Sequence, residues 1–377
     1  MQSPEIIVIG AGPAGAMAEC LLARAGVDVL LTDRAPFPRP KLCGGCLAHA
    51  GFELLEANGL HSIPSVSNAS SIDCLELHSR ARSLTLPVPP YRVIDRARFD
   101  QDLDDAATSA GARFSPDTLA RLRPDRVVEL DQIGGTQGTI TPRTIIIADG
   151  IKGTALRDLD RFAWRTKPSA HVGIGAIAST FPRRCDPGAI SMHHFSGGYA
   201  GVAPLSDGRA IIAGAINPDW IKQQHDTTPM DALLRWIGIH FDPQTAFTTN
   251  PGAPGLTRRR AAIEDDARIF LIGDATGYIE PFTGEGMTWA MTDACMIVEH
   301  ALGAMSDTYT PGAWTSQHAQ LNRRRKLLCR ATARLLRSPR LTGALISAAS
   351  RSRALSGGLS TCVDLMQRQN IPRAGIA

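Results

Sequence analysis

Short apolar runs recur along the chain, at residues 6–9, 145–148 and 269–272. Parallel strands that are buried on both faces have this continuous pattern, because neither side of such a strand meets water. The first run leads into residues 13–25, which are small and helix-forming, and a second strand is predicted over 27–32. This order of strand, helix and strand predicts an α/β domain built on a parallel sheet.

A second pattern fills residues 171–216, where four strand-like segments are separated by turns. One of these turns, Ser206-Asp207-Gly208, joins two segments as in a β-hairpin. We expect the shorter segments 72–78 and 83–88 to join this sheet, and the chain beyond residue 314 is helical in pattern. The resulting division has three parts: a discontinuous first domain (1–70, 95–160 and 260–314), a sheet domain (71–94 and 161–259) and a helical C-terminal segment (315–377).

Composition narrows the class of protein. Of the 377 residues, 44% are hydrophobic and 20% are charged, which is typical of a globular chain. The net charge of +4 is too small to favour a nucleic-acid partner, and no apolar run reaches transmembrane length. The first residues lack the basic region of a secretory signal, so we expect a cytoplasmic protein whose eight cysteines are reduced.

A glycine-rich turn follows the first predicted strand. Gly10, Gly12 and Gly15 form the pattern G-x-G-x-x-G, with Pro13 and Ala14 between them. These glycines permit a tight turn, close approach of a pyrophosphate and close packing of the helix on the strand. Asp33 ends the second strand, where an acid can bind ribose hydroxyls, and Arg34 follows it. The pattern predicts a site for FAD or NAD rather than NADP.

Two later segments add polar residues after buried strands. Asp149-Gly150 follows one strand, and Gly273-Asp274 follows another. Asp274 is placed to accept hydrogen bonds from ribityl hydroxyls. A Pro-Thr-Gly-Glu-Gly turn (281 and 283–286) then opens a long helix, whose free N–H groups and positive dipole end would stabilise an anion on a reduced flavin.

With these motifs the chain resembles the FAD-dependent oxidoreductases that include geranylgeranyl reductases and aromatic hydroxylases of the group A flavin monooxygenase type. The resemblance covers most of residues 5–300 and implies a Rossmann-like FAD-binding domain with a β-sheet substrate domain, as in p-hydroxybenzoate hydroxylase. It also implies that Arg96 reaches toward the dinucleotide and that Leu119 lies beside the adenine. The predicted FAD-binding residues are Gly10, Gly12, Pro13, Ala14, Gly15, Asp33, Arg34, Lys41, Gly44, Gly45, Arg96, Leu119, Asp149, Gly150, Gly273, Asp274, Pro281, Gly284, Glu285 and Gly286.

The stretch Cys43-Gly44-Gly45-Cys46 has three interpretations. A zinc site would need a second pair of ligands, and the remaining cysteines are isolated, so we predict no metal. A redox disulfide is a second alternative, as in disulfide reductases. The third comes from the resemblance, because geranylgeranyl reductases carry Lys-x-Cys-Gly-Gly beside the flavin, matched here from Lys41 to Gly45. We favour the third, a loop that lines the flavin site.

The sheet domain departs from the geranylgeranyl reductase pattern. That family usually has Tyr-x-Trp-x-Phe-Pro along its isoprenoid channel, whereas this chain has Tyr199-Ala200-Gly201-Val202-Ala203-Pro204. The loss of two large rings widens the site and favours an apolar or aromatic substrate. Cys43, Tyr199 and His194 are the catalytic candidates. Halogenation is disfavoured because no lysine occurs between Lys41 and Lys152.

The leading functional prediction is therefore a monooxygenase that hydroxylates an apolar or aromatic substrate, with NAD(P)H as electron donor. The alternatives are an FAD-dependent C=C reductase of the geranylgeranyl reductase type and a flavoprotein maturation factor that acts on a protein substrate. Arginines alternate with leucines over 323–341. We interpret this segment as a solvated basic helix face, with contact to an anionic membrane surface or an acidic carrier as the alternative.

Overall fold

The computed structural model describes residues 3–41, 43–79, 82–135, 137–183, 185–224, 227–249, 252–253, 255–265, 268–279, 284–336 and 338–367. Of the predicted site residues, Pro281 lies outside this part of the chain.

The predicted apolar runs form a parallel sheet that holds the first half of the fold. Within the described residues it has six strands in the order β18-β19-β10-β1-β2-β6, with only β18 antiparallel. Their side chains are buried in the central strands, as the continuous apolar pattern requires. The bounds are β1 Ile6–Ile9, β2 Val29–Thr32, β6 Arg113–Ser115, β10 Thr144–Ile147, β18 Glu264–Asp265 and β19 Ile269–Leu271.

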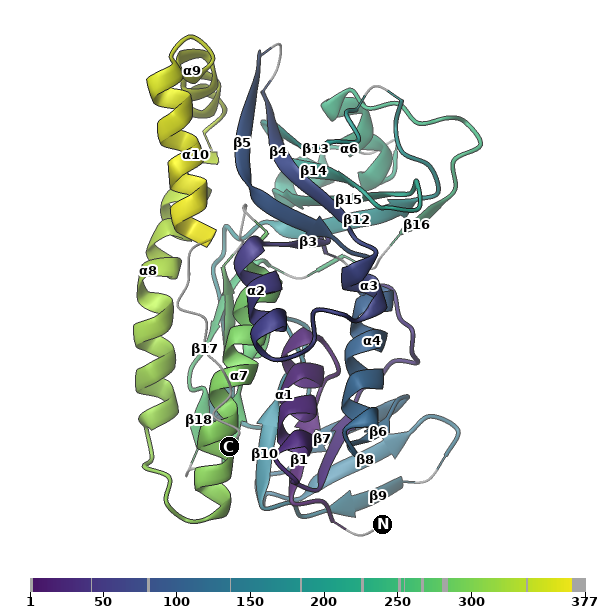
Figure 1. The fold of residues 1–377 in the computed structure, drawn as a ribbon, viewed down its shortest axis with the longest axis vertical. Coiled ribbons are helices and arrows are strands. Elements are labelled where there is room, and N and C mark those ends of the chain that lie inside the picture. The colour runs from purple at the N-terminus through teal and green to yellow at the C-terminus, as the bar shows by residue number, and fades with distance from the viewer. Residues whose placement is uncertain are drawn as a thin grey trace.

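Helices cover one face of this sheet and a small sheet covers the other. The helices α1 (Pro13–Arg24), α4 (Arg96–Ser109) and α7 (Gly286–Met305) pack around one core cluster. A three-stranded sheet of β7 (Thr118–Leu122), β8 (Val128–Gln132) and β9 (Gln137–Ile140) packs with the opposite face. The helices α2 (His49–Ala57) and α3 (Pro64–Ser67) lie above α1 and α4, toward the second sheet (Figure 1).

The second sheet lies across the end of the first domain (Figure 1). Among the described residues it has eight strands in the order β16-β12-β15-β14-β13-β4-β5-β3. The predicted segments 72–78 and 83–88 lie in it as β4 and β5, which are longer than expected. The bounds are β3 Cys46–Leu47, β4 Ser70–Ser79, β5 Arg82–Val93, β12 Val172–Ala178, β13 Ala189–Phe195, β14 Gly198–Pro204, β15 Ala210–Ile216 and β16 Phe247–Thr249.

The remaining elements are a small sheet, two helices that pack on the large sheet, and the C-terminal helices. Strands β11 (Trp164–Thr166), β17 (Thr257–Arg260) and β20 (Gly277–Ile279) form a further small sheet. Helices α5 (Pro218–Lys222) and α6 (Pro229–Ile237) pack on the side of the large sheet that carries Val202 and Ile212. As predicted, the chain beyond 314 is helical in its described part, with α8 (Ala313–Leu336), α9 (Pro339–Ala349) and α10 (Arg353–Gln367).

Helix α1 carries a fully buried carboxyl group, Glu19, on its packed side. Burial, with Asp104 as the second cause, raises the pKa of Glu19 to about 9. The folded protein therefore keeps a proton that the unfolded chain releases above its ordinary pKa of 4.5. Stability contributed by this protonated group is lost as the pH rises from about 4.5 through about 9.

We expect Glu19→Gln to reduce the loss of stability between about pH 6 and about pH 8.5, because the amide has no proton to release. Urea unfolding at the two pH values measures the difference in each protein. Glu129→Gln is the matched control, since the Glu129 side chain is 46% exposed. An equal pH dependence in wild type and Glu19→Gln would contradict the assignment.

Candidate functional site

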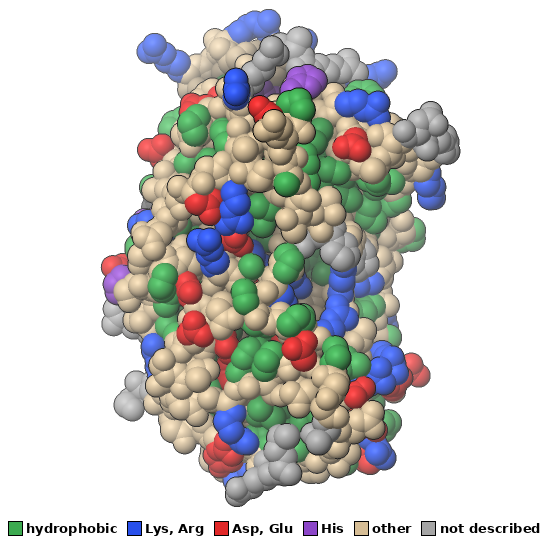
Figure 2. Space-filling view, turned by 90° about the vertical axis from the view of Figure 1, so that its right-hand side faces the viewer, with side chains coloured by type: hydrophobic (Ala, Val, Ile, Leu, Met, Phe, Trp, Pro, Cys, Tyr) green, Lys and Arg blue, Asp and Glu red, His purple; other side chains and the backbone are tan. Residues whose placement is uncertain are grey.

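A cavity of about 560 Å³ lies between the parallel sheet and the large sheet. It is lined at one end by Gly10 and Ala148, which follow the carboxyl ends of β1 and β10. Ligands of open α/β sheets bind at this edge, because the turns there leave a crevice. The surface is hollowed at mid-height on this side of the molecule, and Lys and Arg side chains gather beside the hollow (Figure 2).

The glycine turn has the backbone that the sequence predicted. Gly10 has φ +108°, and a Cβ there would lie 2.5 Å from the Ala148 carbonyl oxygen. A Cβ on Gly15 would lie 1.9 Å from the Gly10 carbonyl oxygen. Both glycines are thus required by packing, and Gly12 lines the cavity together with Gly10. This division of roles matches the glycine fingerprint of a dinucleotide site.

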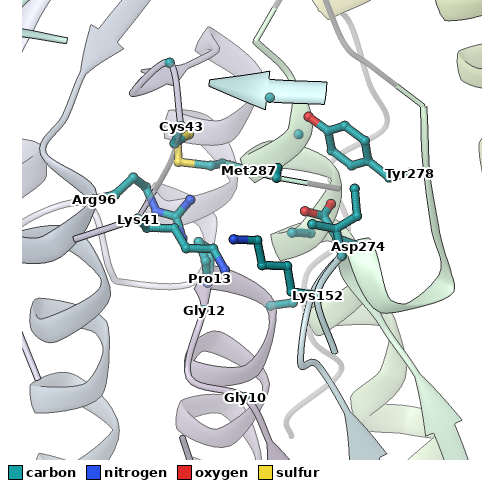
Figure 3. Close-up of a pocket in the computed structure, with 18 of the residues that line it drawn as sticks. Gly10, Gly12, Pro13, Lys41, Cys43, Arg96, Lys152, Asp274, Tyr278 and Met287 are labelled. Carbon is teal, nitrogen blue, oxygen red and sulfur yellow. The ribbon is translucent and has the colours of Figure 1, made fainter. Parts of the chain in front are cut away.

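Positive charge surrounds the start of α1. Gly12 is the N-cap of this helix without a side-chain cap, and the first turn carries no acid. Lys41, Arg96 and Lys152 point into the space above Gly12 and Pro13 (Figure 3). Burial, followed by the charges of Arg39 and Arg96, lowers the pKa of Lys41. Free helix N–H groups and three cations form a site that suits a pyrophosphate.

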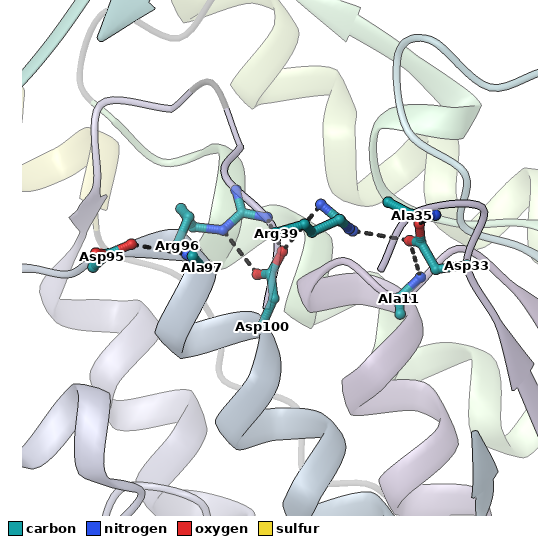
Figure 4. Close-up of polar contacts among 8 residues, drawn as sticks. All are labelled: Ala11, Asp33, Ala35, Arg39, Asp95, Arg96, Ala97 and Asp100. Atoms are coloured by element: carbon teal, nitrogen blue, oxygen red, sulfur yellow. Dashed lines mark hydrogen bonds and ion pairs between the residues drawn. The ribbon is translucent and has the colours of Figure 1, made fainter. Parts of the chain in front are cut away.

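Arg96 is held in place by an acid on its own helix. Its Nε and Nη2 atoms each donate to the Asp100 carboxylate at 2.9 Å (Figure 4). Asp100 is fully buried, and Arg39 Nη1 lies 3.6 Å from it. Asp95 caps the helix by accepting from Ala97 N at 2.9 Å. The two-point contact fixes the guanidinium beside the glycine turn.

Asp33 follows β2 and lies in the cavity wall. Its Oδ2 accepts from Ala11 N at 2.9 Å and from Arg39 Nη2 at 2.9 Å, and its Oδ1 accepts from Ala35 N at 3.0 Å (Figure 4). Arg34 and Leu119 line the cavity near it. A carboxylate oxygen has more than one lone-pair site, so Asp33 can still accept from a bound hydroxyl.

Two further acids lie at strand ends in the cavity wall. Burial raises the pKa of Asp274 to about 6, although Lys41 and Arg96 oppose this shift. Burial also raises the pKa of Asp149, which accepts from Ala155 N at 3.0 Å. Asp274 faces the three cations across the cavity (Figure 3). The Asp274 carboxyl group can therefore form hydrogen bonds with hydroxyls of a ligand that lies between it and the three cations.

The start of α7 forms another part of the wall. Gly284, Gly286 and Met287 line the cavity, and the first turn of α7 carries no acid. Gly284 has φ +76°, and a Cβ there would lie 2.9 Å from the Cβ of Cys46. Only glycine permits this backbone at so short a distance from the cysteine loop. The two predicted flavin-lining segments, 43–46 and 284–286, are thus in contact.

Cys43 and Cys46 both line the cavity as free thiols. Cys43 Sγ accepts from Gly45 N at 3.4 Å, and Cys46 Sγ donates to the Gly44 carbonyl oxygen at 3.3 Å. Burial, with Cys43 as the second cause, raises the pKa of Cys46 to about 12. Disulfide exchange requires a thiolate, so the environment of Cys46 opposes a role for this residue as the attacking thiol.

We expect the double variant Cys43→Ser, Cys46→Ser to retain FAD binding and reduction, because serine preserves size and hydrogen bonding. Anaerobic dithionite titration should give two electrons per FAD in both proteins. Four electrons per FAD in wild type and two in the variant would show instead that the cysteines form a redox disulfide.

The large sheet contributes a wall of small residues. Gly173 on β12, Ala213 and Ala215 on β15, and Gly201 and Ala203 on β14 line the cavity. In register, Gly173 lies opposite Ala215, and Ala213 lies opposite Gly201. We call these five residues the small-residue patch. Met192 also lines the cavity and packs over Gly201, where a Cβ would lie 2.6 Å from its Sδ. The rest of the patch leaves room for a flat ring or a narrow chain against the sheet.

Most of the predicted cofactor residues lie in the cavity wall, but some do not. Gly15, Gly45, Gly273 and Glu285 lie outside the lining. Of the catalytic candidates, Cys43 and Tyr199 line the cavity. His194 does not, although it pairs with Tyr199 across β13 and β14. The sequence interpretation missed the lining residues Arg39, Tyr91, Lys152, Tyr278 and Met287.

The lining fits FAD on the grounds of its own chemistry. The glycine turn admits a pyrophosphate where a side chain would block it, and three cations surround that point. Acids lie at the positions where ribose and ribityl hydroxyls are expected. The segments 43–46 and 284–286 present glycine backbone, free thiols and an uncapped helix start. These groups would hold the two halves of the dinucleotide.

Comparison with known proteins agrees with this assignment. The family described as FAD binding domain matches residues 4–309. The menaquinone reductase of Mycolicibacterium smegmatis is 27% identical, with 93% of this chain and 89% of that protein covered. The digeranylgeranylglycerophospholipid reductase 1 of Methanopyrus kandleri is 28% identical, with 83% and 84% covered. A myxobacterial chondrochloren halogenase has the same fold at a TM-score of 0.75 and 16% identity, with 99% and 94% covered.

Proposed function

Because this chain belongs to the FAD binding domain family and is an FAD-dependent oxidoreductase, we propose that it reduces a carbon–carbon double bond in an isoprenoid-type apolar substrate. The observation that carries the proposal is that an apolar sheet wall and the free thiols of Cys43 and Cys46 line the same cavity as the glycine turn. The fold alone does not separate reductases from halogenases or hydroxylases.

The named relatives support reduction over hydroxylation. The menaquinone and digeranylgeranylglycerophospholipid reductases match this chain over most of their own length and act on molecules with long isoprenoid chains. The likeness to the halogenase rests on fold at low identity, so it carries no reaction type. Hydroxylation, which the sequence favoured because of Gly201 and Ala203, is kept as the competing outcome of the test.

In such a reaction, different residues would bind the cofactor and orient the substrate. When bound, FAD would supply the two-electron redox chemistry. Lys41, Arg96 and the start of α1 would hold its pyrophosphate. Asp33 would bind the ribose hydroxyls, and Asp274 would bind the ribityl hydroxyls. The small-residue patch would orient the chain of the substrate and exclude water from it.

Saturation of a double bond also needs protons, and the cavity wall carries donors for them. Cys43, Tyr91 and Tyr199 line the cavity. Burial, with Glu285 as the second cause, raises the pKa of Tyr91, so the phenol stays protonated. We assign the proton donor to Cys43, with Tyr199 orienting the substrate. NADH or NADPH is the proposed electron donor.

The proposal is tested by the mass of the product. Purified protein with FAD, NADH or NADPH (or dithionite as a substitute donor) and a menaquinone or geranylgeranyl lipid should give a product that has gained two hydrogen atoms. Cys43→Ser should slow product formation at least about 10-fold while FAD binding persists. A product that has gained an oxygen atom would show that the protein hydroxylates its substrate and does not reduce it.

A further inference from the structure

The helical C-terminal segment concentrates the positive charge of the chain. Residues 315–377 contain twelve Lys and Arg but one acid, Asp364, which gives a net charge of +11. Since the whole chain carries +4, the remaining residues carry −7. The face on the right of Figure 1 mixes acidic and basic side chains (Figure 2). The positive charge is therefore concentrated in residues 315–377 and is not spread over the chain.

The exposed side of α8 combines this charge with an apolar side chain. Arg323, Leu327, Arg330 and Arg334 are all exposed and follow one another at intervals of four, three and four residues. This spacing places them on one stripe of a helix. Leu327 is 67% exposed, so the stripe presents an apolar side chain between arginines. In Figure 1, α8 forms the outer edge of the molecule.

The next two helices repeat the combination. Leu341 on α9 is 59% exposed, and Leu355 and Leu365 on α10 are 48% and 50% exposed. Arg340 and Arg353 are exposed near the starts of the same helices. We call the exposed Arg and Leu side chains of α8, α9 and α10 the basic–apolar face. Four exposed leucines on three consecutive helices, together with the arginines, give this layer both charge and apolar surface.

The inner side of this layer backs the cavity. Ile346 and Ala349 of α9 and Val363 of α10 belong to the same core cluster as Leu75 and Ile190, which line the cavity. Gln367, at the end of α10, forms a side-chain hydrogen bond with the lining residue Tyr91. One continuous apolar cluster thus joins the wall of the cavity to helices whose outer side is basic and apolar.

We propose that the basic–apolar face docks on an anionic lipid bilayer surface, from which the apolar substrate enters the cavity. Arginines bind anionic headgroups, and exposed leucines insert into the interface, whereas an acidic soluble protein would need only the arginines. No helix of the described residues is long and apolar enough to span a bilayer. The reason for docking rests on the proposed function, but binding to a bilayer needs no turnover.

The test is sedimentation of the FAD-loaded protein with vesicles of phosphatidylglycerol and phosphatidylcholine mixed, and of phosphatidylcholine alone. We expect binding to the anionic vesicles only, with release at about 1 M salt, where screening is strong. The triple variant Arg323→Glu, Arg330→Glu, Arg334→Glu should lower the partition coefficient at least about 100-fold. Leu327→Gln, Leu341→Gln should lower it about 10-fold without a change of charge.

The matched control is Arg98→Glu, Arg183→Glu, Lys222→Glu, which makes the same change of charge at exposed positions elsewhere. It should bind anionic vesicles within about twofold of wild type. FAD affinity, measured in every variant, reports whether the fold is intact. Equal losses in the α8 triple variant and the control, or no binding by wild type, would overturn the proposal. Failure of the product test with intact vesicle binding would overturn only the proposed reaction.

Discussion

Replacing Arg96 by methionine should weaken FAD binding at least about 100-fold, because it removes a charge that faces the start of α1. Arg96 is 9% exposed, and a Cβ on Gly12 would lie 4.0 Å from its Nη2. The change also removes the close ionic partner of Asp100, which is fully buried, and leaves Arg39 at 3.6 Å. Quenching of FAD fluorescence on titration into apoprotein measures the dissociation constant.

Two companion variants separate charge from general damage to the fold. Arg96→Lys keeps the charge but not the two-point contact to Asp100, so its loss of affinity should be smaller. Arg98→Met lies on the same helix, and because the Arg98 side chain is 68% exposed, FAD affinity should not change. Affinity within threefold of wild type in a folded Arg96→Met protein would show that Arg96 does not hold the cofactor.

Replacing Ala213 by phenylalanine should lower kcat/KM at least about 100-fold, because the ring fills the space that the small-residue patch leaves for the substrate. Ala213 lies opposite Gly201 in register, and the Met192 side chain packs over Gly201, so the new ring would compete with Met192 and the substrate for the same space. FAD affinity should stay within about threefold, since Ala213 lies on the sheet wall and not at the glycine turn. Steady-state rates and FAD titration measure the two effects separately.

Ala213→Ser is the control, since it changes polarity with little change of volume, and its kcat/KM should fall far less. If Ala213→Phe keeps the activity of wild type, the substrate does not lie against β15. If it loses FAD as well, the patch belongs to the cofactor site and not to the substrate site.

The sequence predicted the parts of the site that depend on local backbone. Gly10 and Gly15 occur where no Cβ fits, and Asp33 lies at the end of a strand whose apolar run is continuous. Such features depend on a few neighbouring residues, and their spacing is visible in one dimension. The sheet strands at 189–195 and 198–204 followed from the same kind of local pattern.

The parts that were missed depend on contacts between distant segments. Lys152 reaches the space above Gly12 from the loop after β10, and Arg39 joins Asp33 to Asp100 across the cavity edge. Tyr91 lines the cavity because of the register of β5 with β4, which includes a shift between Ile72 and Cys74. Pairing register and loop direction are set by tertiary packing, so a single sequence does not reveal them.

Anaerobic turnover tests the central claim, reduction of a carbon–carbon double bond, most directly. With FAD, a nicotinamide coenzyme or dithionite, and an isoprenoid lipid, the substrate should be consumed in the complete absence of oxygen. The product should contain two additional hydrogen atoms. Complete loss of turnover without oxygen, with a hydroxylated product when air is restored, would contradict the account.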